Sequence, residues 1–236
     1  MNNNNINPVR NNKAITGEGK ISNGVKAVIF DLGNVLIDFD HMIAAKKISS
    51  FTDKSPQEIF NLFFDSEVTA LFEEGKIAPL NFFSEVKKML NLKLDYTQFL
   101  PIWNEIFFLT EKNQAVYNLA KILRAHYKIA LLSNINILHF DYLKKKFSLF
   151  DTFHHIITSF ASGIRKPDPL IYEKTLDLLK ATPQNTFYTD DRAEFTEKAS
   201  SLGIRGFIFK DAEQLKRDLL GNGININPAP LGIFKK

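Results

Sequence analysis

Five short apolar runs are spread along the chain, and each has the length of a buried β-strand. They cover residues 26–30, 128–132, 155–158, 186–189 and 206–209. Continuous apolar runs, without alternating polar positions, are typical of strands that are covered on both faces of a parallel sheet. The pattern therefore predicts a parallel sheet of these segments.

Apolar positions recur at helical spacing between these runs. In 113–125 the repeat is formed by Val116, Leu119, Ala120 and Leu123, as expected for one buried face of a helix. A second helix is predicted over 168–181, where Asp168 can cap and Pro169 suits the first turn, and a third over 192–202, which stops at Gly203. Alternating strands and helices indicate an α/β, doubly wound fold.

The stretch 41–112 interrupts this alternation. Its pattern is helical throughout, with helices predicted over 56–64, 67–74, 79–90 and 96–108. Ten Phe residues lie in it, and we expect most of them to form the core of a small helical bundle and one or two to line a pocket. Because the stretch separates the first two predicted strands, it is expected to be an inserted helical domain.

The two ends of the chain differ from the middle. Residues 1–24 are polar and begin with four consecutive Asn residues, which predicts a disordered tail. Residues 221–236 contain three Gly and two Pro residues and are expected to form an irregular extension. The α/β core is accordingly assigned to 25–40 and 113–220.

Composition and charge exclude several classes of protein. The 236 residues are 44% apolar, and there is no Cys, which rules out disulfides, thiolate metal sites and Cys nucleophiles. Of the net charge of +4, +3 lies on residues 1–26, so a basic surface for nucleic acid is not expected. No apolar run is long enough to span a membrane, and no secretory signal is evident. A cytoplasmic location is expected, and the oligomeric state is left open.

Polar residues follow three of the predicted strands directly. They are Asp31, Ser133 and the pair Asp190–Asp191, and Lys166 comes shortly after the predicted strand 155–158. Each of these residues alone would be an ordinary cap or turn residue. Ligands of open parallel sheets bind outside the carboxyl ends of the strands, so these side chains are expected to meet at one rim.

Together these residue types are suited to phosphoryl transfer. Carboxylates can hold a Mg²⁺ ion that neutralises the charge of a phosphate ester. Asp31 would be the nucleophile, with an aspartyl-phosphate as intermediate. Ser133 and Lys166 would hold the phosphoryl oxygens, with backbone N–H groups around 32–34 and at Asn134 as further donors.

Four segments resemble the motifs of the haloacid-dehalogenase-like hydrolases. They are 28–36, 131–134, 163–168 and 187–191, the last followed by Leu202-Gly203-Ile204. The resemblance runs from about residue 25 to 210 and implies a Rossmann-like core with a helical cap of the C1 type. The segment Phe-Asp-Leu-Gly-Asn-Val is most similar to that of sugar-phosphate phosphatases such as the glucose-1-phosphatase-like enzymes. The family resemblance implies that Asp31, Asp190, Asp191 and the carbonyl of Gly33 are metal ligands.

The sequence departs from the family pattern at Gly33. Most phosphatases of the superfamily carry a second Asp there, which protonates the leaving oxygen and later activates water. General acid–base catalysis is typically worth about 10²–10⁴ in rate. Asp38 and Asp40 are possible substitutes, although both lie toward the cap. In the cap, the turn 73–77 could reach the mouth of the site.

Two other functions remain open. A haloacid dehalogenase would use the same Asp on carbon without a metal, which leaves the Asp190–Asp191 pair unexplained. A member that has lost turnover would bind a phosphorylated metabolite or a partner and release no phosphate. The favoured interpretation is a Mg²⁺-dependent phosphatase of a small phosphorylated metabolite, with a sugar or polyol phosphate as the expected substrate. His41 and His139 follow the first two motifs and are expected to pack or to lie at the surface.

Overall fold

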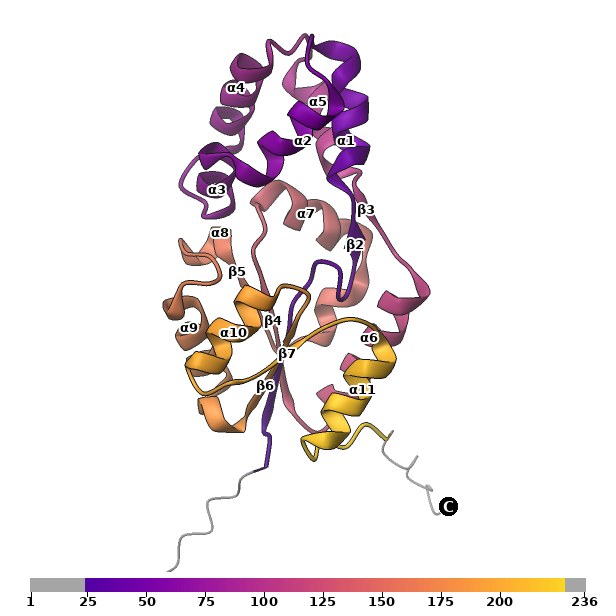
Figure 1. The fold of residues 1–236 in the computed structure, drawn as a ribbon, viewed down its shortest axis with the longest axis vertical. Helices are drawn as coiled ribbons and strands as arrows, with labels where there is room; N and C mark the ends of the chain where they lie inside the picture. Colours follow the sequence, from indigo (N-terminus) through magenta and orange to yellow (C-terminus); the bar gives the residue numbers. More distant parts are fainter. Residues whose placement is uncertain (1–23, 228–236) are drawn as a thin grey trace, which may run out of the picture.

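The computed structural model of the protein describes residues 24–227; the tail predicted over 1–24 and most of the extension predicted over 221–236 lie outside this range. Its centre is a parallel sheet in the order β5-β4-β1-β6-β7 (Figure 1). The predicted α/β fold, with a five-stranded parallel sheet and a helical insertion, is confirmed. The strands are β1 (Ala27–Phe30), β4 (Lys128–Ser133), β5 (His155–Thr158), β6 (Thr186–Asp190) and β7 (Arg205–Ile208).

Side chains of the central strands alternate between two apolar layers. Val28 and Phe30 of β1 belong to the layer formed with α6, α7 and α11, whereas Ala27 and Ile29 belong to the layer formed with α9 and α10. The strands are therefore buried on both faces, as their apolar sequences require. The core helices are α6 (Glu111–Arg124), α7 (Ile137–Lys146), α8 (Ser159–Ser162), α9 (Pro169–Leu179), α10 (Ala193–Ser201) and α11 (Ala212–Gly221), with 3₁₀ turns η2 (Ser148–Thr152) and η3 (Pro183–Asn185).

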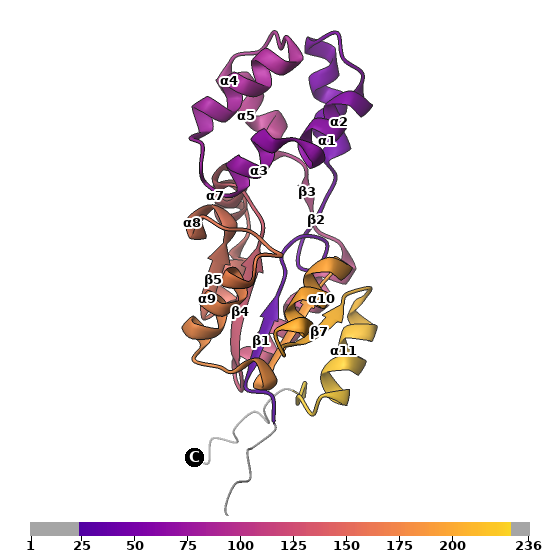
Figure 2. The same ribbon diagram turned by 60° about the vertical axis from the view of Figure 1, so that its left-hand side comes forward.

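The inserted helices form a second body above the carboxyl ends of the strands (Figure 2). Their own apolar cluster includes Phe72, Phe82, Phe99 and Trp103, all with at most 1% of their surface exposed. Phe51 and Phe108 are exposed instead, so the prediction that most Phe residues here pack in a core holds with exceptions. The elements are α1 (His41–Ile48), η1 (Ser49–Phe51), α2 (Pro56–Asp65), α3 (Glu67–Glu73), α4 (Pro79–Leu90) and α5 (Tyr96–Asn104).

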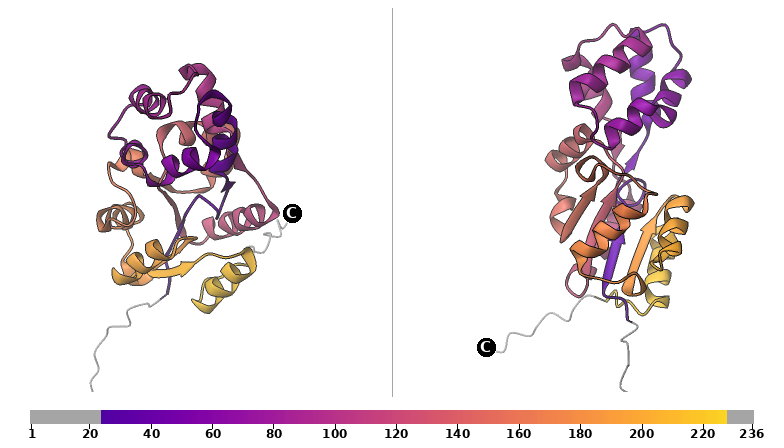
Figure 3. Two further views of the ribbon diagram at one scale, coloured as in Figure 1. Left: turned by 45° about the horizontal axis from the view of Figure 1, so that its top comes forward. Right: turned by 90° about the vertical axis from the view of Figure 1, so that its left-hand side faces the viewer.

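Two short strands join the helical insertion to the core. β2 (Asp38–Phe39) pairs antiparallel with β3 (Phe107–Phe108), with Asp38 opposite Phe108. The helix predicted over 96–108 is thus wrong at its end, because Phe107 and Phe108 pair with a strand that lies about 70 residues earlier. Figure 3 shows the two bodies stacked along the long axis of the molecule with this connection between them.

Three core helices, α7, α8 and α11, were not recognised in the sequence. Their few buried positions, such as Leu143 in α7 and Leu215 and Leu219 in α11, give a weak apolar repeat. None of the helices within residues 24–227 is long and apolar enough to cross a membrane.

Candidate active site

The carboxyl ends of β1, β4 and β6 bring the predicted polar residues to one rim of the sheet. A cavity of about 590 Å³ lies between this rim and the helical insertion. Asp31, Ser133, Lys166 and Asp191 line it, as do Gly33 and Asn134. The structure therefore brings together residues that are up to 160 positions apart in the sequence, as the strand-end rule predicts.

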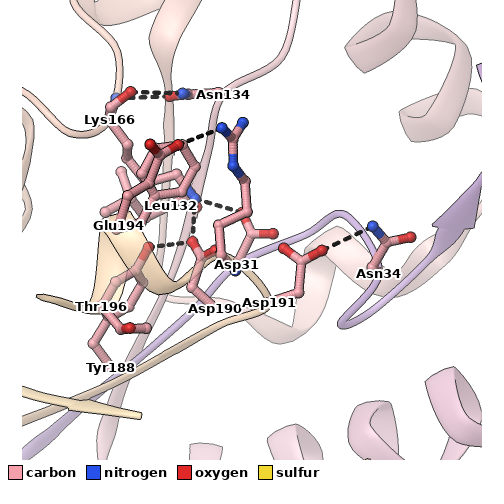
Figure 4. A network of polar contacts seen from close by, with 12 residues as sticks. Asp31, Asn34, Leu132, Asn134, Lys166, Tyr188, Asp190, Asp191, Glu194 and Thr196 are labelled. Carbon is pink, nitrogen blue, oxygen red and sulfur yellow. Dashed lines mark hydrogen bonds and ion pairs between the residues drawn. The ribbon is translucent and has the colours of Figure 1, made fainter. Parts of the chain in front are cut away.

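Lys166 is the centre of a buried polar network (Figure 4). Its ammonium donates to Oδ1 of Asp31 at 2.7 Å, to Oδ2 of Asp190 at 2.6 Å and to the carbonyl of Leu132 at 3.2 Å. Only 1% of Lys166 is exposed. Three acceptors match the three N–H groups of an ammonium, so the side chain is fixed in position.

Two further residues hold this network. Both oxygens of Asp190 are engaged, since Oδ2 also accepts from the hydroxyl of Tyr188 and Oδ1 accepts from the backbone N–H of Arg192 at 2.9 Å. The side-chain amide of Asn134 bonds to the backbone carbonyl and N–H of Lys166, at 2.9 and 2.8 Å. The side chains of Asp190 and Asn134 thus position Lys166, which the sequence analysis did not anticipate.

Asn34 is a site residue that sequence reasoning used only for its backbone. Its side-chain amide donates to Oδ2 of Asp191 at 2.8 Å. Its backbone has a φ of +56°, a left-handed conformation that Asn tolerates better than most residues. The turn after β1 therefore aims this amide at the acidic pair after β6, and an Asn next to a Gly directly after a buried strand was the available signal.

The charges of the cluster act strongly on one another because they are buried. Burial, with the carboxylates of Asp190 and Asp191, raises the pKa of Asp31 to about 7, although the ammonium of Lys166 acts to lower it. Burial also raises the pKa of Asp191. Burial acts to lower the pKa of Lys166, but the carboxylates of Asp190 and Asp31 outweigh it and raise that pKa overall.

The acidic residues fit a divalent cation. Asp31, Asp190 and Asp191 each offer an oxygen atom, and these atoms lie within 4.8 Å of one another. Three carboxylates face the single ammonium of Lys166 in this cluster, so negative charge is in excess. Oxygen ligands and uncompensated negative charge are what Mg²⁺ selects.

The space beside Gly33 is filled by an aromatic ring. A Cβ atom added at Gly33 would lie 2.7 Å from Cε1 of Phe39, closer than such atoms pack. The two acids proposed as substitutes lie elsewhere. Asp38 is engaged with Lys112 at 2.8 Å and with Asn113 at 2.9 Å at the base of the insertion. Asp40 is exposed and caps α1 through the N–H of Met42 at 2.8 Å.

The wall of the cavity on the side of the insertion is largely aromatic. Phe60, Trp103 and Phe107 line it together with His41 and His139. Phe60 and Phe107 agree with the expectation that one or two Phe residues of the insertion line a pocket, whereas Trp103 and Phe39 were not foreseen. The sequence offers no spacing rule for this wall, because its residues come from separate helices and from the β2–β3 pair.

His139 links the core to the insertion and is buried. Its Nε2 lies 3.0 Å from the carbonyl of Trp103 and must donate, while its Nδ1 lies 3.1 Å from the amide nitrogen of Asn136 and must accept. These partners select the neutral ring. Burial, together with nearby His41, accordingly lowers the pKa of His139 to about 3.

The turn after α3 rests directly on the core. Ser159 Oγ donates to the carbonyl of Glu73 at 2.6 Å. Arg165 Nη1 lies 3.7 Å from Oε2 of Glu73. Gly75, with a φ of +68°, comes so close to Phe160 that an added Cβ would lie 2.2 Å from the carbonyl oxygen of Phe160. The turn predicted to reach the site thus contacts its rim, and Glu73 lines the cavity.

Comparison with known proteins places these motifs in context. Residues 25–194 match the sequence pattern of the haloacid dehalogenase-like hydrolases. A sesquiterpene phosphatase of Aspergillus oryzae is 24% identical over 79% of this chain and 91% of its own length. A D-ribitol-5-phosphate phosphatase of Bacteroides thetaiotaomicron is 22% identical over 83% of this chain and 97% of its own length.

Solved structures of related chains share the fold. An enzyme of the same family from Bacteroides thetaiotaomicron, crystallised with magnesium and inorganic phosphate, is 26% identical, covers 80% of this chain and 96% of its own, and superposes with a TM-score of 0.69. The L-2-haloacid dehalogenase of Xanthobacter autotrophicus superposes with a TM-score of 0.57 at 21% identity, over 88% of this chain and 85% of its own.

Proposed function

We propose that this chain, which belongs to the haloacid dehalogenase-like hydrolase family, is a magnesium-dependent phosphomonoester hydrolase that forms an aspartyl-phosphate on Asp31. One observation carries the proposal: the ammonium of Lys166 binds Asp31 and Asp190 together, at 2.7 and 2.6 Å, at the floor of a cavity that Asp191 also lines. A nucleophile, a cation and further acids thus meet at one point.

Asp31 has the surroundings that a carboxylate nucleophile needs. Lys166 holds its Oδ1, which fixes the plane of the carboxylate and favours its charged form. Burial strips the carboxylate of water, which strengthens its interactions with neighbouring charges. Asp31 attacks phosphorus, the ester bond breaks, and water then hydrolyses the aspartyl-phosphate.

The phosphoryl oxygens are assigned to Ser133 and Lys166. Ser133 ends β4 with its hydroxyl at the rim, and 4% of the residue is exposed. The predicted contribution of Asn134 to phosphate binding falls to its backbone N–H, because its side chain holds Lys166. The backbone around 32–34 supplies further donors in the turn after β1.

The metal is assigned to Asp31, Asp191 and the backbone carbonyl of Gly33. Asp190, predicted as a further ligand, adds negative charge to the cluster while both of its oxygens are hydrogen-bonded. When bound, Mg²⁺ would neutralise charge on the phosphate and so allow an anionic nucleophile to approach. The related structure that contains magnesium and inorganic phosphate supports magnesium as the metal.

The substrate is proposed to be a small phosphorylated metabolite, with a sugar or polyol phosphate as the first candidate. A cavity of about 590 Å³ suits a ligand of that size. The D-ribitol-5-phosphate phosphatase supports a polyol phosphate, and the sesquiterpene phosphatase shows that related proteins also act on apolar phosphates. The resemblance to glucose-1-phosphatase-like enzymes of the C1-capped type supports the same class.

The test is phosphate release from a panel of sugar, polyol and prenyl phosphates, with and without Mg²⁺. We expect turnover that requires Mg²⁺ and is absent in Asp31→Asn. Halide release from a 2-haloacid that persists in the presence of a chelator would show a dehalogenase instead.

A binding protein without turnover is the second candidate, because Gly33 supplies no acid and Phe39 fills the space beside it. Isothermal titration with Mg²⁺ and inorganic phosphate separates the two functions. Binding of both, with no phosphate released from any substrate of the panel, would favour the second candidate.

A further inference from the structure

The general acid that is missing at position 33 cannot be supplied by a side chain at that position. A side chain at Gly33 would collide with Phe39, whose Cε1 lies 2.7 Å from the position of an added Cβ. Phe39 is held by β2, which pairs with β3, and its ring contacts those of His41 and Phe107 at 5.1 and 6.0 Å between centroids. The cavity wall beside Gly33 is therefore formed by rings. The proton for the leaving oxygen must come from a side chain on another wall.

Four acidic residues line the cavity within the described part of the chain: Asp31, Asp40, Glu73 and Asp191. Asp31 is the proposed nucleophile and Asp191 belongs to the proposed metal site. Asp40 is exposed and caps α1. Glu73 is left as the acid without another assigned role in the reaction.

Glu73 approaches from the side on which the leaving group must lie. Phosphoryl transfer places the attacking and leaving oxygens roughly in line. Asp31 attacks from the floor, at the end of β1, so the leaving oxygen points away from the sheet toward the insertion. Thr69, Ala70 and Glu73 line the cavity from α3, at the spacing of one helix face.

The turn that carries Glu73 is held against the core. Its carbonyl accepts from Ser159 Oγ at 2.6 Å, and Ser159 is fully buried. The close approach of Gly75 to the backbone of Phe160, the residue after Ser159, holds the turn against α8 at a second point. A side chain whose backbone is held at two points has the limited freedom that a proton donor requires.

We propose that Glu73 protonates the leaving oxygen and afterwards activates water, in place of the side chain that Gly33 lacks. This assignment rests on the proposed phosphatase function. As Asp31 bonds to phosphorus, the ester P–O bond breaks, its electron pair stays on the leaving oxygen, and that oxygen takes the proton of Glu73 to give the alcohol. The Glu73 carboxylate then takes a proton from the water that attacks the aspartyl-phosphate, which releases phosphate and restores Asp31.

The surroundings of Glu73 are consistent with a proton donor. Burial raises its pKa, against the guanidinium groups of Arg165 and Arg192, which lower it; Glu74 raises it and Lys166 lowers it. Arg165, 3.7 Å away, can stabilise the carboxylate left after proton transfer. The two histidines of the cavity are poorer donors near neutral pH, because burial lowers the pKa of His41 to about 4 and that of His139 to about 3.

The experiment compares leaving groups in Glu73→Gln. The substrates are p-nitrophenyl, phenyl and benzyl phosphate, which share an aromatic body and have increasingly basic leaving oxygens. Only a basic leaving oxygen needs a proton. We expect kcat/KM for benzyl phosphate to fall about 10²–10⁴-fold and kcat/KM for p-nitrophenyl phosphate to stay close to that of the wild type. A burst of p-nitrophenol should then precede slow turnover, because the second step lacks its base.

Glu67→Gln is the matched control. Glu67 is an exposed acid in the first turn of the same helix α3 and lies outside the cavity. It should leave all three substrates unchanged, and thermal unfolding should show both variants folded. An equal loss with all three substrates in Glu73→Gln, or no loss, would overturn the role of Glu73 and leave the phosphatase function standing. Wild-type protein without Asp31-dependent phosphate release would instead remove the function itself.

Discussion

The rim of the sheet and the wall of the insertion that faces it differ in how they are built. At the rim, Asp31 directly follows β1, and Ser133 and Asp190 end β4 and β6, so their positions at the ends of neighbouring strands decide where they lie. The opposite wall is assembled from Phe60, Trp103 and other side chains of separate helices. The sheet topology decides which residues form the rim, whereas only tertiary packing decides which residues form the wall. Predictions can be tested on each.

The largest effect is expected at the rim. Asp31→Asn removes the nucleophile while keeping the shape of the side chain, so phosphate release should fall to background with every substrate. A phosphate-release assay measures it. Asp168→Asn is the control, because Asp168 caps α9 outside the cavity and its replacement should preserve activity. Persisting turnover in Asp31→Asn would show that the strand-end rule had selected the wrong residue.

A smaller effect is expected from Asn34→Gly. Gly keeps the left-handed backbone that Asn34 adopts but removes the amide that binds Asp191 at 2.8 Å. Losing such a partner of a metal ligand typically costs about 10–100-fold in metal affinity. The Mg²⁺ concentration for half-maximal activity should rise accordingly, with kcat recovered at saturating Mg²⁺. An unchanged Mg²⁺ requirement would mean that Asp191 needs no support from Asn34.

Where the rim meets the opposite wall, Gly33→Ala should destabilise the fold. The added methyl group meets the ring of Phe39 at 2.7 Å, and overpacking of this kind typically costs about 1–3 kcal/mol. Urea denaturation measures the loss. Phe39→Leu combined with Gly33→Ala should cost less than the sum of the two single changes, because the ring that clashes is gone. Strict additivity would contradict the contact.

The smallest effect concerns His139 and pH. Its folded pKa of about 3 lies below the ordinary value of 6.5, so the unfolded chain binds a proton that the folded protein excludes. The stability due to this difference is present above pH 6.5 and is lost as the pH falls toward 3. Between pH 7 and 5.5 the loss should be about 1 kcal/mol. His139→Gln, which keeps a donor and an acceptor without titrating, should show a flatter pH dependence; an identical slope would refute the buried neutral ring.

The rim and the opposite wall also differ in how well the sequence predicts them. The strands, the insertion and the meeting of Asp31, Ser133, Lys166 and Asp191 could be predicted, because apolar runs and strand ends are local signals. The exchange of hydrogen bonds between Asn134 and Lys166 could not, since the two residues meet only after folding. The same holds for the ring of Phe39 beside Gly33, for the end of α5, where Phe107 pairs with a distant strand, and for the anchoring of Glu73.

The β2–β3 pair has a consequence for how the molecule can change over time. The chain leaves the core for the insertion at Asp38 and returns at Phe108. These two residues are direct partners in the β2–β3 pair. A segment whose two ends are neighbours can be lengthened, shortened or exchanged without moving the framework to which it is attached. The framework that carries the rim and the segment that carries the opposite wall can therefore be inherited separately.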